Sequence, residues 1–434
     1  MSGNTFETLM APSLDLMSMK QLGNIKTRRV QVNPESGSSF SLTSTATQDV
    51  FFSLPSGGSK YTMINGANSY LTFDILMSNA GGTGVTLIGP CSGDFNAVIR
   101  GLETTVMGTT VEQIDRYNVM SSIFTDFTPA GRSTTMNSVL QGGGASKLGA
   151  VYAVAGAYAR PALPIYSAFY GVLASQFAPA TAGTRMRFTL EAPHTALQTD
   201  GSVDGVTTYV ITNMSLMMEY CDIEPSVWEA MAQQSGYVFK THGIGVSNYN
   251  TTLTASSTAN SVLIPARKSA VKHIWNTVRV SANLNSPRVN SLGARLNPKA
   301  RQLYWTISGK QYPPIPIRTV DATNTYYGSG EVMAEFLKTM RNLHATYTDC
   351  CFTGTQYLDT TGTANTASFV FGFDWETDAD PLTISGIDTN DSNIYLQLDS
   401  ISAGVTSAST LDSFVFYDAI LMMNLQTGAV SVIQ

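Results

Sequence analysis

Charged residues are scarce in this chain of 434 residues: Asp, Glu, Lys and Arg together make up 13% of it, about half the usual share. Hydrophobic residues account for 43% and aromatic residues for 10%. Disordered chains need high charge and few aromatic residues, so the composition excludes that class. It also argues against a mainly helical protein, because exposed helix faces are normally built from Glu, Lys, Arg and Ala. So little charge predicts that much of the surface is covered by another molecule.

The sequence also lacks the residue patterns that characterise common enzymes and metal sites. Its four histidines are widely spaced, so no H-E-x-x-H pattern exists. Neither a G-x-S-x-G elbow nor a cysteine-protease signature is present. We therefore predict that the chain is not an enzyme and that it has no cofactor and no small-molecule substrate.

Signals for export, disulfides and membrane insertion are missing as well. The first residues include the acidic Glu7 and Asp15 and have no basic start before an apolar core, so they do not form a signal peptide. The most apolar charge-free run, 161–184, is interrupted by prolines, and no transmembrane helix is predicted. No C-x-x-C pair exists for zinc. Free, buried thiols in a reducing compartment are expected at all four cysteines, which are Cys91, Cys221, Cys350 and Cys351.

Most of the chain consists of short segments in which apolar and polar residues alternate, separated by turns rich in Gly, Ser, Thr and Asn. This period of two is typical of strands, and it occurs at 70–76, 186–191, 209–218, 271–280, 302–307, 368–373 and 393–398. The links between them are longer than hairpin turns, which favours Greek-key crossings. Three short amphipathic segments predict helices, at 111–124, 224–233 and 330–343.

Part of the sequence repeats. Segments 209–220 and 414–425 share a valine and a Leu-Met-Met triplet at matching positions. Segments 186–191 and 394–399 precede them at similar distances, and a predicted helix lies upstream in each half. Three features in the same order indicate two copies of one β-domain with a helix inserted midway.

This repeat defines the expected domains. An apolar N-terminal arm covers residues 1–29, the first copy 30–222, a linker 223–236 and the second copy 237–434. Exposed apolar side chains in the arm would promote non-specific association. They are therefore predicted to dock on a neighbouring subunit, and the alternative is that they pack on their own domain. These interface candidates are Phe6, Leu9, Met10, Leu14 and Met17.

Charge is distributed unevenly in two places. Segment 261–320 has ten basic residues and no acidic one, whereas 342–434 has eleven acidic residues and no Lys or Arg. The two segments either pair inside one folded domain or let the molecule dock against its own copies. A small basic cluster before the first strand is a candidate for contacts with packaged nucleic acid through phosphates; it consists of Lys20, Lys26, Arg28 and Arg29.

Four acidic residues alternate along one short stretch, at Asp374, Glu376, Asp378 and Asp380. In an extended chain they project from one face about 7 Å apart. Like charges at that spacing repel each other, and either a hard cation such as calcium or solvation in a loop relieves the repulsion. The EF-hand pattern does not fit, so no metal is predicted and these four residues are a weak candidate.

The order of these features resembles the double jelly-roll major capsid proteins of tailless icosahedral DNA viruses, a group that includes the adenovirus hexon, virophage and polinton-type capsids and the nucleocytoplasmic viruses. The passages that carry the resemblance are 98–117, where a strand leads into a helix with Tyr117, the proline-containing 161–166 followed by 186–193, and 302–317 and 385–398 in the second copy. The resemblance implies an all-β fold of two tandem eight-stranded antiparallel jelly-roll barrels with a short helix inserted in each.

The resemblance also implies a function. The chain would be a major capsid structural protein that assembles as pseudo-hexagonal homotrimers, which tile an icosahedral virion shell around the viral genome. Its partners would be neighbouring capsomers, minor capsid or penton proteins and, through the interior arm, packaged nucleic acid or an internal membrane. It would be made inside the host cell. The alternatives are a tandem β-sandwich binding module such as a lectin or adhesin, which would be exported and monomeric, and a β-rich hydrolase with clustered acids.

Overall fold

The computed structural model describes most of the chain after the N-terminal arm. The described residues are 26–56, 62–81, 84–91, 94–127, 138–141, 152–153, 157–200, 205–254, 259–320, 328–340, 350, 352–358, 367–376, 384–400, 408–424 and 426–434. Among them no helix is long and apolar enough to cross a membrane.

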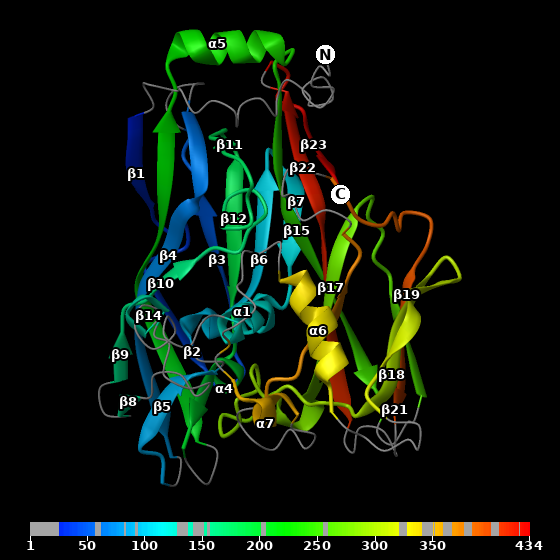
Figure 1. Ribbon diagram of the computed structural model, residues 1–434. Helices are drawn as coiled ribbons and strands as arrows, with labels where there is room; N and C mark the ends of the chain where they lie inside the picture. The colour runs from blue at the N-terminus through cyan, green and yellow to red at the C-terminus, as the bar shows by residue number, and fades with distance from the viewer. Residues whose placement is uncertain are drawn as a thin grey trace.

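The first half of the chain forms barrel 1 from two main antiparallel sheets (Figure 1). Sheet 1A has the order β1 (Lys26–Val32), β14 (Val206–Asp222), β4 (Thr62–Ala80), β10 (Ala162–Pro164), and β2 (Ser39–Thr43), β9 (Ala157–Ala159) and β11 (Ala178–Pro179) pair with its strands. Sheet 1B has the order β3 (Gln48–Ser53), β12 (Thr184–Leu190), β6 (Ile99–Val106), β7 (Thr109–Ile114). A small third sheet joins β13 (Leu197–Thr199), β5 (Leu87–Pro90) and β8 (Tyr152–Ala153).

The second half forms barrel 2 in the same way. Sheet 2A has the order β15 (Val238–Leu253), β22 (Ser409–Asn424), β17 (Val271–Val280), β20 (Phe371–Asp374), with β23 (Val430–Ile433) paired to β22. Sheet 2B has the order β16 (Ala259–Ile264), β21 (Ile394–Ser400), β18 (Ala300–Ile307), β19 (Lys310–Arg318). The helices among the described residues are η3 (Phe95–Val98), α1 (Tyr117–Asp126), α3 (Ser138–Gln141), α4 (Pro193–Ala196), α5 (Pro225–Gln234), η5 (Ser281–Asn283), α6 (Gly330–Thr339) and α7 (Gly354–Tyr357).

Both barrels have jelly-roll topology. When the eight main strands of each half are counted along the chain, the first, eighth, third and sixth form one sheet, and the second, seventh, fourth and fifth form the other. In both halves a helix, α1 or α6, lies between the fifth and sixth strands. The two segments that repeat most clearly in the sequence are the eighth strands, β14 and β22. The prediction of two tandem jelly-roll barrels with a helix in each is therefore confirmed.

Two boundaries differ from the prediction. Residues 111–124 were expected to form one helix, but β7 takes Thr109–Ile114 and α1 begins only at Tyr117. The cause is the preceding turn: Met107 and Gly108 both have positive φ (50° and 83°), which is the two-residue turn that suits a hairpin. Barrel 2 has the same turn at Ser308 and Gly309 (50° and 75°) between β18 and β19. The second difference is that β1 begins at Lys26, ahead of the boundary predicted at Val30.

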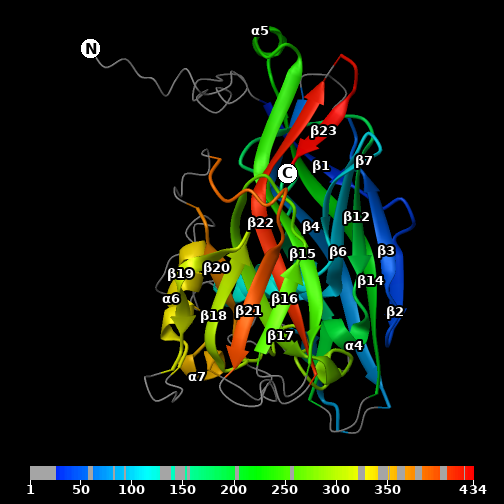
Figure 2. The same ribbon diagram turned by 90° about the vertical axis from the view of Figure 1, so that its right-hand side faces the viewer.

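The four sheets lie side by side in the order 1A, 1B, 2A, 2B, as Figure 1 shows from left to right. Strand β7 at the edge of sheet 1B contacts β15 of sheet 2A. In the side view of Figure 2 the strands run roughly along the long axis of the molecule, and α5 and β23 lie at one end of it. The two barrels thus form one row with a junction in the middle and one free sheet face at either end.

Candidate functional site: the barrel junction and the outer sheet faces

The centre of sheet 2A is buried on both sides. All ten residues of β17 are buried, as are 241–246 of β15 and 411–419 of β22. A sheet with one face in water shows alternating burial instead. Barrel 1 covers the outer side of sheet 2A, so in this chain the junction is a continuation of the core.

Residues 173–175 of barrel 1 lie beside β15 and pair with it almost as an extra strand would. The amide of Ile244 donates to the carbonyl of Leu173 at 3.0 Å, and the amide of Ser175 donates to the carbonyl of His242 at 3.1 Å. Gly243 lies between these two bonds, with its Cα against the backbone of Ala168. A side chain at position 243 would separate the two backbones, so glycine is required there.

Aromatic rings from both barrels fill the lower part of the junction. Phe124 of α1 stacks on Tyr166, with ring centroids 4.7 Å apart, and packs edge-on against Trp275 of β17 at 5.0 Å. Phe127, directly after α1, packs on Phe336 of α6 at 4.8 Å. The end of α1 and helix α6 therefore come together at the junction.

A buried ion pair crosses the junction. Arg295 of barrel 2 pairs with Asp126 at the end of α1 and donates to the hydroxyl of Ser122 at 2.8 Å. The side chains of Arg295 and Asp126 are 0% and 3% exposed. Removing one member of such a pair leaves an unpaired charge in the core.

Ion pairs inside barrel 2 explain part of the uneven charge distribution. Lys272 pairs with Glu376 and lies 3.3 Å from Asp418, and Arg279 lies 2.7 Å from Asp412. All five side chains are almost completely buried. In this part of the chain the basic segment 261–320 and the acidic segment 342–434 pair internally, as one of the two interpretations predicted.

The buried carboxyl of Glu112 binds residues 167 and 168, which lead into the segment of barrel 1 that pairs with β15. Glu112 of β7 accepts from the Ser167 hydroxyl at 2.6 Å and from the Ala168 amide at 2.7 Å. Burial raises the pKa of this carboxyl from 4.5 to about 7. The folded chain therefore holds a proton between pH 4.5 and 7 that the unfolded chain has released, and the free energy of unfolding falls as the pH rises through this range.

Replacing Glu112 with glutamine is expected to remove about 3 kcal/mol of this fall. Part of the fall remains, because burial also raises the pKa of Asp94 to about 6. Urea denaturation at pH 5 and pH 7.5 measures it, with Glu331→Gln on the exposed side of α6 as the control. If the free energy of unfolding falls by the same amount between these pH values in Glu112→Gln and in the unmodified chain, Glu112 is not the group that causes the fall.

The outer surface of sheet 2B, here called face 2B, carries almost no charge in its centre. Leu263 and Tyr395 are opposite each other on β16 and β21 and are 45% and 40% exposed. Polar but uncharged side chains surround them, so the composition is that of a protein–protein contact rather than of a free surface. Face 2B consists of Ser261, Leu263, Tyr304, Thr306, Tyr395 and Gln397.

The outer surface of sheet 1A, at the other end of the row, has a similar patch, here called face 1A. Leu76 is 46% exposed, and Val210 lies between it and Ser41. Face 1A consists of Ser41, Thr43, Leu76, Ser78, Thr208 and Val210. Sheet 1B, which does not end the row, differs: its outer side carries the ion pairs Arg185–Glu35, at 2.5 Å, and Arg187–Glu103.

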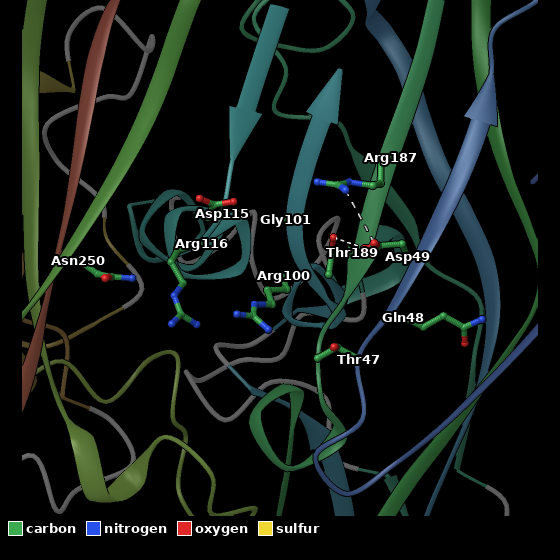
Figure 3. Close-up of a pocket in the computed structure, with 10 residues that line it drawn as sticks. All are labelled: Thr47, Gln48, Asp49, Arg100, Gly101, Asp115, Arg116, Arg187, Thr189 and Asn250. Carbon is green, nitrogen blue, oxygen red and sulfur yellow. Dashed lines mark hydrogen bonds and ion pairs between the residues drawn. The ribbon is translucent and has the colours of Figure 1, made fainter. Parts of the chain in front are cut away.

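A polar groove of about 510 Å³ lies between the outer side of sheet 1B and β15 of barrel 2. Figure 3 shows the guanidinium groups of Arg100 and Arg116 beside each other in it, with Asn250 of β15 on the other side of Arg116. Within the described part of the chain neither guanidinium has an ion-pair partner, unlike that of Arg187 in the same groove. Two neighbouring guanidinium groups suit a carboxylate or phosphate group.

The predicted contact residues are placed only in part. Phe6, Leu9, Met10, Leu14, Met17 and Lys20 lie outside the described residues. Lys26, Arg28 and Arg29 lie on β1, and two of them have partners within the chain. Arg28 is 3.2 Å from Asp222 and lies over the ring of Tyr220, while Arg29 donates to the hydroxyl of Tyr70 and lies over its ring.

Of the four acidic residues in the weak metal candidate, the structure describes two. Asp374 ends β20, Glu376 follows it, and Asp378 and Asp380 lie outside the described residues. The residue that sequence analysis missed is His273 of β17, which is opposite Asp374 in the sheet. Burial lowers the pKa of its imidazole to about 3. Only the register of β17 against β20 reveals this neighbour, and no local pattern encodes it.

Three of the four cysteines are described. Cys91 and Cys221 are buried free thiols, as predicted, whereas the free thiol of Cys350 is only half-buried. Burial raises the pKa of Cys91 to about 12, so its thiol stays protonated and unreactive. Cys351 lies outside the described residues.

Comparison with solved structures identifies the fold. The chain is similar to the Faustovirus major capsid protein, with a TM-score of 0.58 and 9% identity over 92% of this chain and 90% of that one. It is also similar to a chain in the structure of the Sputnik virophage (0.55, 11%, 94% and 88%) and to the mavirus major capsid protein (0.52, 13%, 93% and 89%). No protein-family model and no curated protein matches the sequence. At these identities the likeness shows a shared fold, the double jelly roll.

Proposed function

We propose that this chain is a major capsid structural protein, which assembles as homotrimers that tile an icosahedral virion shell around the viral genome. The fold is that of the major capsid proteins of Faustovirus and mavirus. The observation that carries the proposal is the pair of faces with uncharged centres, 1A and 2B, at the two ends of a row whose two barrels share a buried junction. Neither face contains a cleft with clustered acids, which a hydrolase needs, and both suit broad contacts between subunits.

The order of the sheets indicates how copies join. Inside the chain, barrel 1 meets barrel 2 through different surfaces, so the junction is heterologous. The same order continues between chains when face 2B of one copy lies against face 1A of the next. A heterologous contact gives a closed ring when its rotation fits. Three copies then form a ring of six barrels, which is the pseudo-hexagonal shape that tiles a shell.

Further contacts in the shell follow from the charged regions. The groove with Arg100 and Arg116 offers a site for an acidic group of a neighbouring capsomer or of a minor capsid or penton protein. Lys26, Arg28 and Arg29 start the chain's first strand near the end where α5 lies (Figure 1), and we assign this end to the shell interior, facing nucleic acid or an internal membrane. The chain is made inside the host cell and remains in the virion, with a structural rather than a catalytic role.

Negative-stain microscopy and light scattering of the purified chain test the proposal. We expect hexagonal trimers, whereas a lectin-like or adhesin-like module gives monomers. Leu263→Glu places a charge in the centre of face 2B and is expected to convert trimers into monomers, with little change in the stability of the monomer because the site is exposed.

Ile433→Glu is the matched control for this change, because Ile433 is also 45% exposed but lies on β23, outside both faces. It should leave the trimer intact. If the unmodified chain is monomeric at micromolar concentration, or if both variants form trimers, the proposed assembly is wrong.

A further inference from the structure

We propose that His273, Asp374 and Glu376 form a binding site for one divalent transition-metal ion of the zinc class. One ligand atom from each of the three residues lies within 4.8 Å of the others. This site does not depend on shell assembly, because it lies where β17 begins and β20 ends, within sheet 2A rather than on face 1A or face 2B.

The first argument is the state of His273. Its side chain is 0% exposed, yet neither ring nitrogen has a hydrogen-bond partner in the described part of the chain. Buried polar atoms without partners are rare and costly. The ring stacks on Phe416, at 4.4 Å, and on Trp275, at 5.8 Å, so packing fixes the plane of the imidazole. A metal ion bound to one nitrogen supplies the missing partner.

The second argument is the local charge. Two carboxylates, those of Glu376 and Asp418, pair with a single buried ammonium group, that of Lys272. One oxygen of Glu376 and one of Asp418 are buried without a hydrogen-bond partner among the described residues. The other oxygen of Asp418 lies 2.8 Å from Nε2 of His242. A doubly charged cation compensates the excess negative charge that Lys272 leaves.

The ligand types select the class of metal. One imidazole and two carboxylates suit Zn²⁺ and the neighbouring transition metals, whereas Ca²⁺ and Mg²⁺ prefer oxygen ligands alone. Three protein ligands leave a fourth tetrahedral position for water. The ligands join two adjacent strands of the sheet that barrel 1 covers, so the ion would stabilise barrel 2 at the junction.

Lys272 gives the proposal a distinctive test. Its ammonium group competes with the metal ion for Glu376, so Lys272→Met is expected to tighten Zn²⁺ binding by about tenfold. His273→Phe keeps a flat ring between Phe416 and Trp275 and removes the ligand nitrogen. It is expected to fold normally without metal and to weaken Zn²⁺ binding by about a hundredfold or more. His194→Phe, in α4 on barrel 1, is the control and should bind Zn²⁺ like the unmodified chain.

Isothermal titration of the chelator-treated full chain with ZnCl₂ measures these effects, and denaturation with and without Zn²⁺ gives an independent readout. We expect one ion per chain and a higher denaturation midpoint with Zn²⁺, both lost in His273→Phe. Absence of binding at 100 µM Zn²⁺, or equal binding by His273→Phe and the unmodified chain, would overturn the proposal. Neither result depends on whether the chain forms trimers.

Discussion

Replacing Gly243 with alanine is expected to lower the free energy of unfolding by about 3 kcal/mol or more. A Cβ atom at this position would overlap the carbonyl oxygen of Ala168 and lie 2.7 Å from its carbonyl carbon. Both are backbone atoms, so no side-chain rotation relieves the overlap. The hydrogen bonds that bracket Gly243, from Ile244 to Leu173 and from Ser175 to His242, must lengthen together. The added methyl group therefore pushes the two barrels apart.

Chemical denaturation of the purified variant measures this effect, and Gly330→Ala is its matched control. Gly330 begins α6, and a Cβ atom there meets nothing within 4 Å. Alanine should change the stability at that site by less than about 1 kcal/mol, in the stabilising direction. If Gly243→Ala unfolds at the same denaturant concentration as Gly330→Ala, the close approach of the barrels is not what holds the junction.

Alternating patterns made the barrels predictable from the sequence. Segment 271–280 was expected as a strand and forms β17 with the same bounds, because its residues have strong strand propensity whatever covers them. The repeat of β14 in β22 located the eighth strands, since both occupy the same place in their barrels. The helix predicted at 111–124 failed because an apolar stripe over a few residues is ambiguous, and the turn at Met107 and Gly108 decided the outcome.

The junction could not be predicted, because its contacts join residues far apart in the chain. Lys272, His273 and Arg279 are polar or charged residues of the kind usually found in solvent, yet all three are buried in sheet 2A. Arg295 and Ser122 are 173 positions apart, and no local pattern links them. A single sequence shows which residues face away from a sheet, but only the packing of the barrels decides what covers that side.

Replacing Arg295 with methionine is expected to destabilise the chain by about 3–5 kcal/mol. Methionine fills much of the same space, but the carboxylate of Asp126 stays buried at the end of α1 without its partner. Adding Asp126→Asn removes that charge, so the double variant should recover about half of the loss. The recovery separates the cost of the stranded charge from the cost of altered packing, which no single variant can do.

Arg185→Met is the matched control, because Arg185 pairs with Glu35 at 2.5 Å in an exposed place, with 45% and 36% of the two side chains accessible. An exposed pair contributes less than about 1 kcal/mol, so this variant should unfold close to the unmodified chain. Denaturation at pH 7 compares all four proteins. If Arg295→Met and Arg185→Met lower the free energy of unfolding by the same small amount, the pair across the junction is solvated in solution. The barrels are then held together by the aromatic rings around Phe124 and Trp275 rather than by charge.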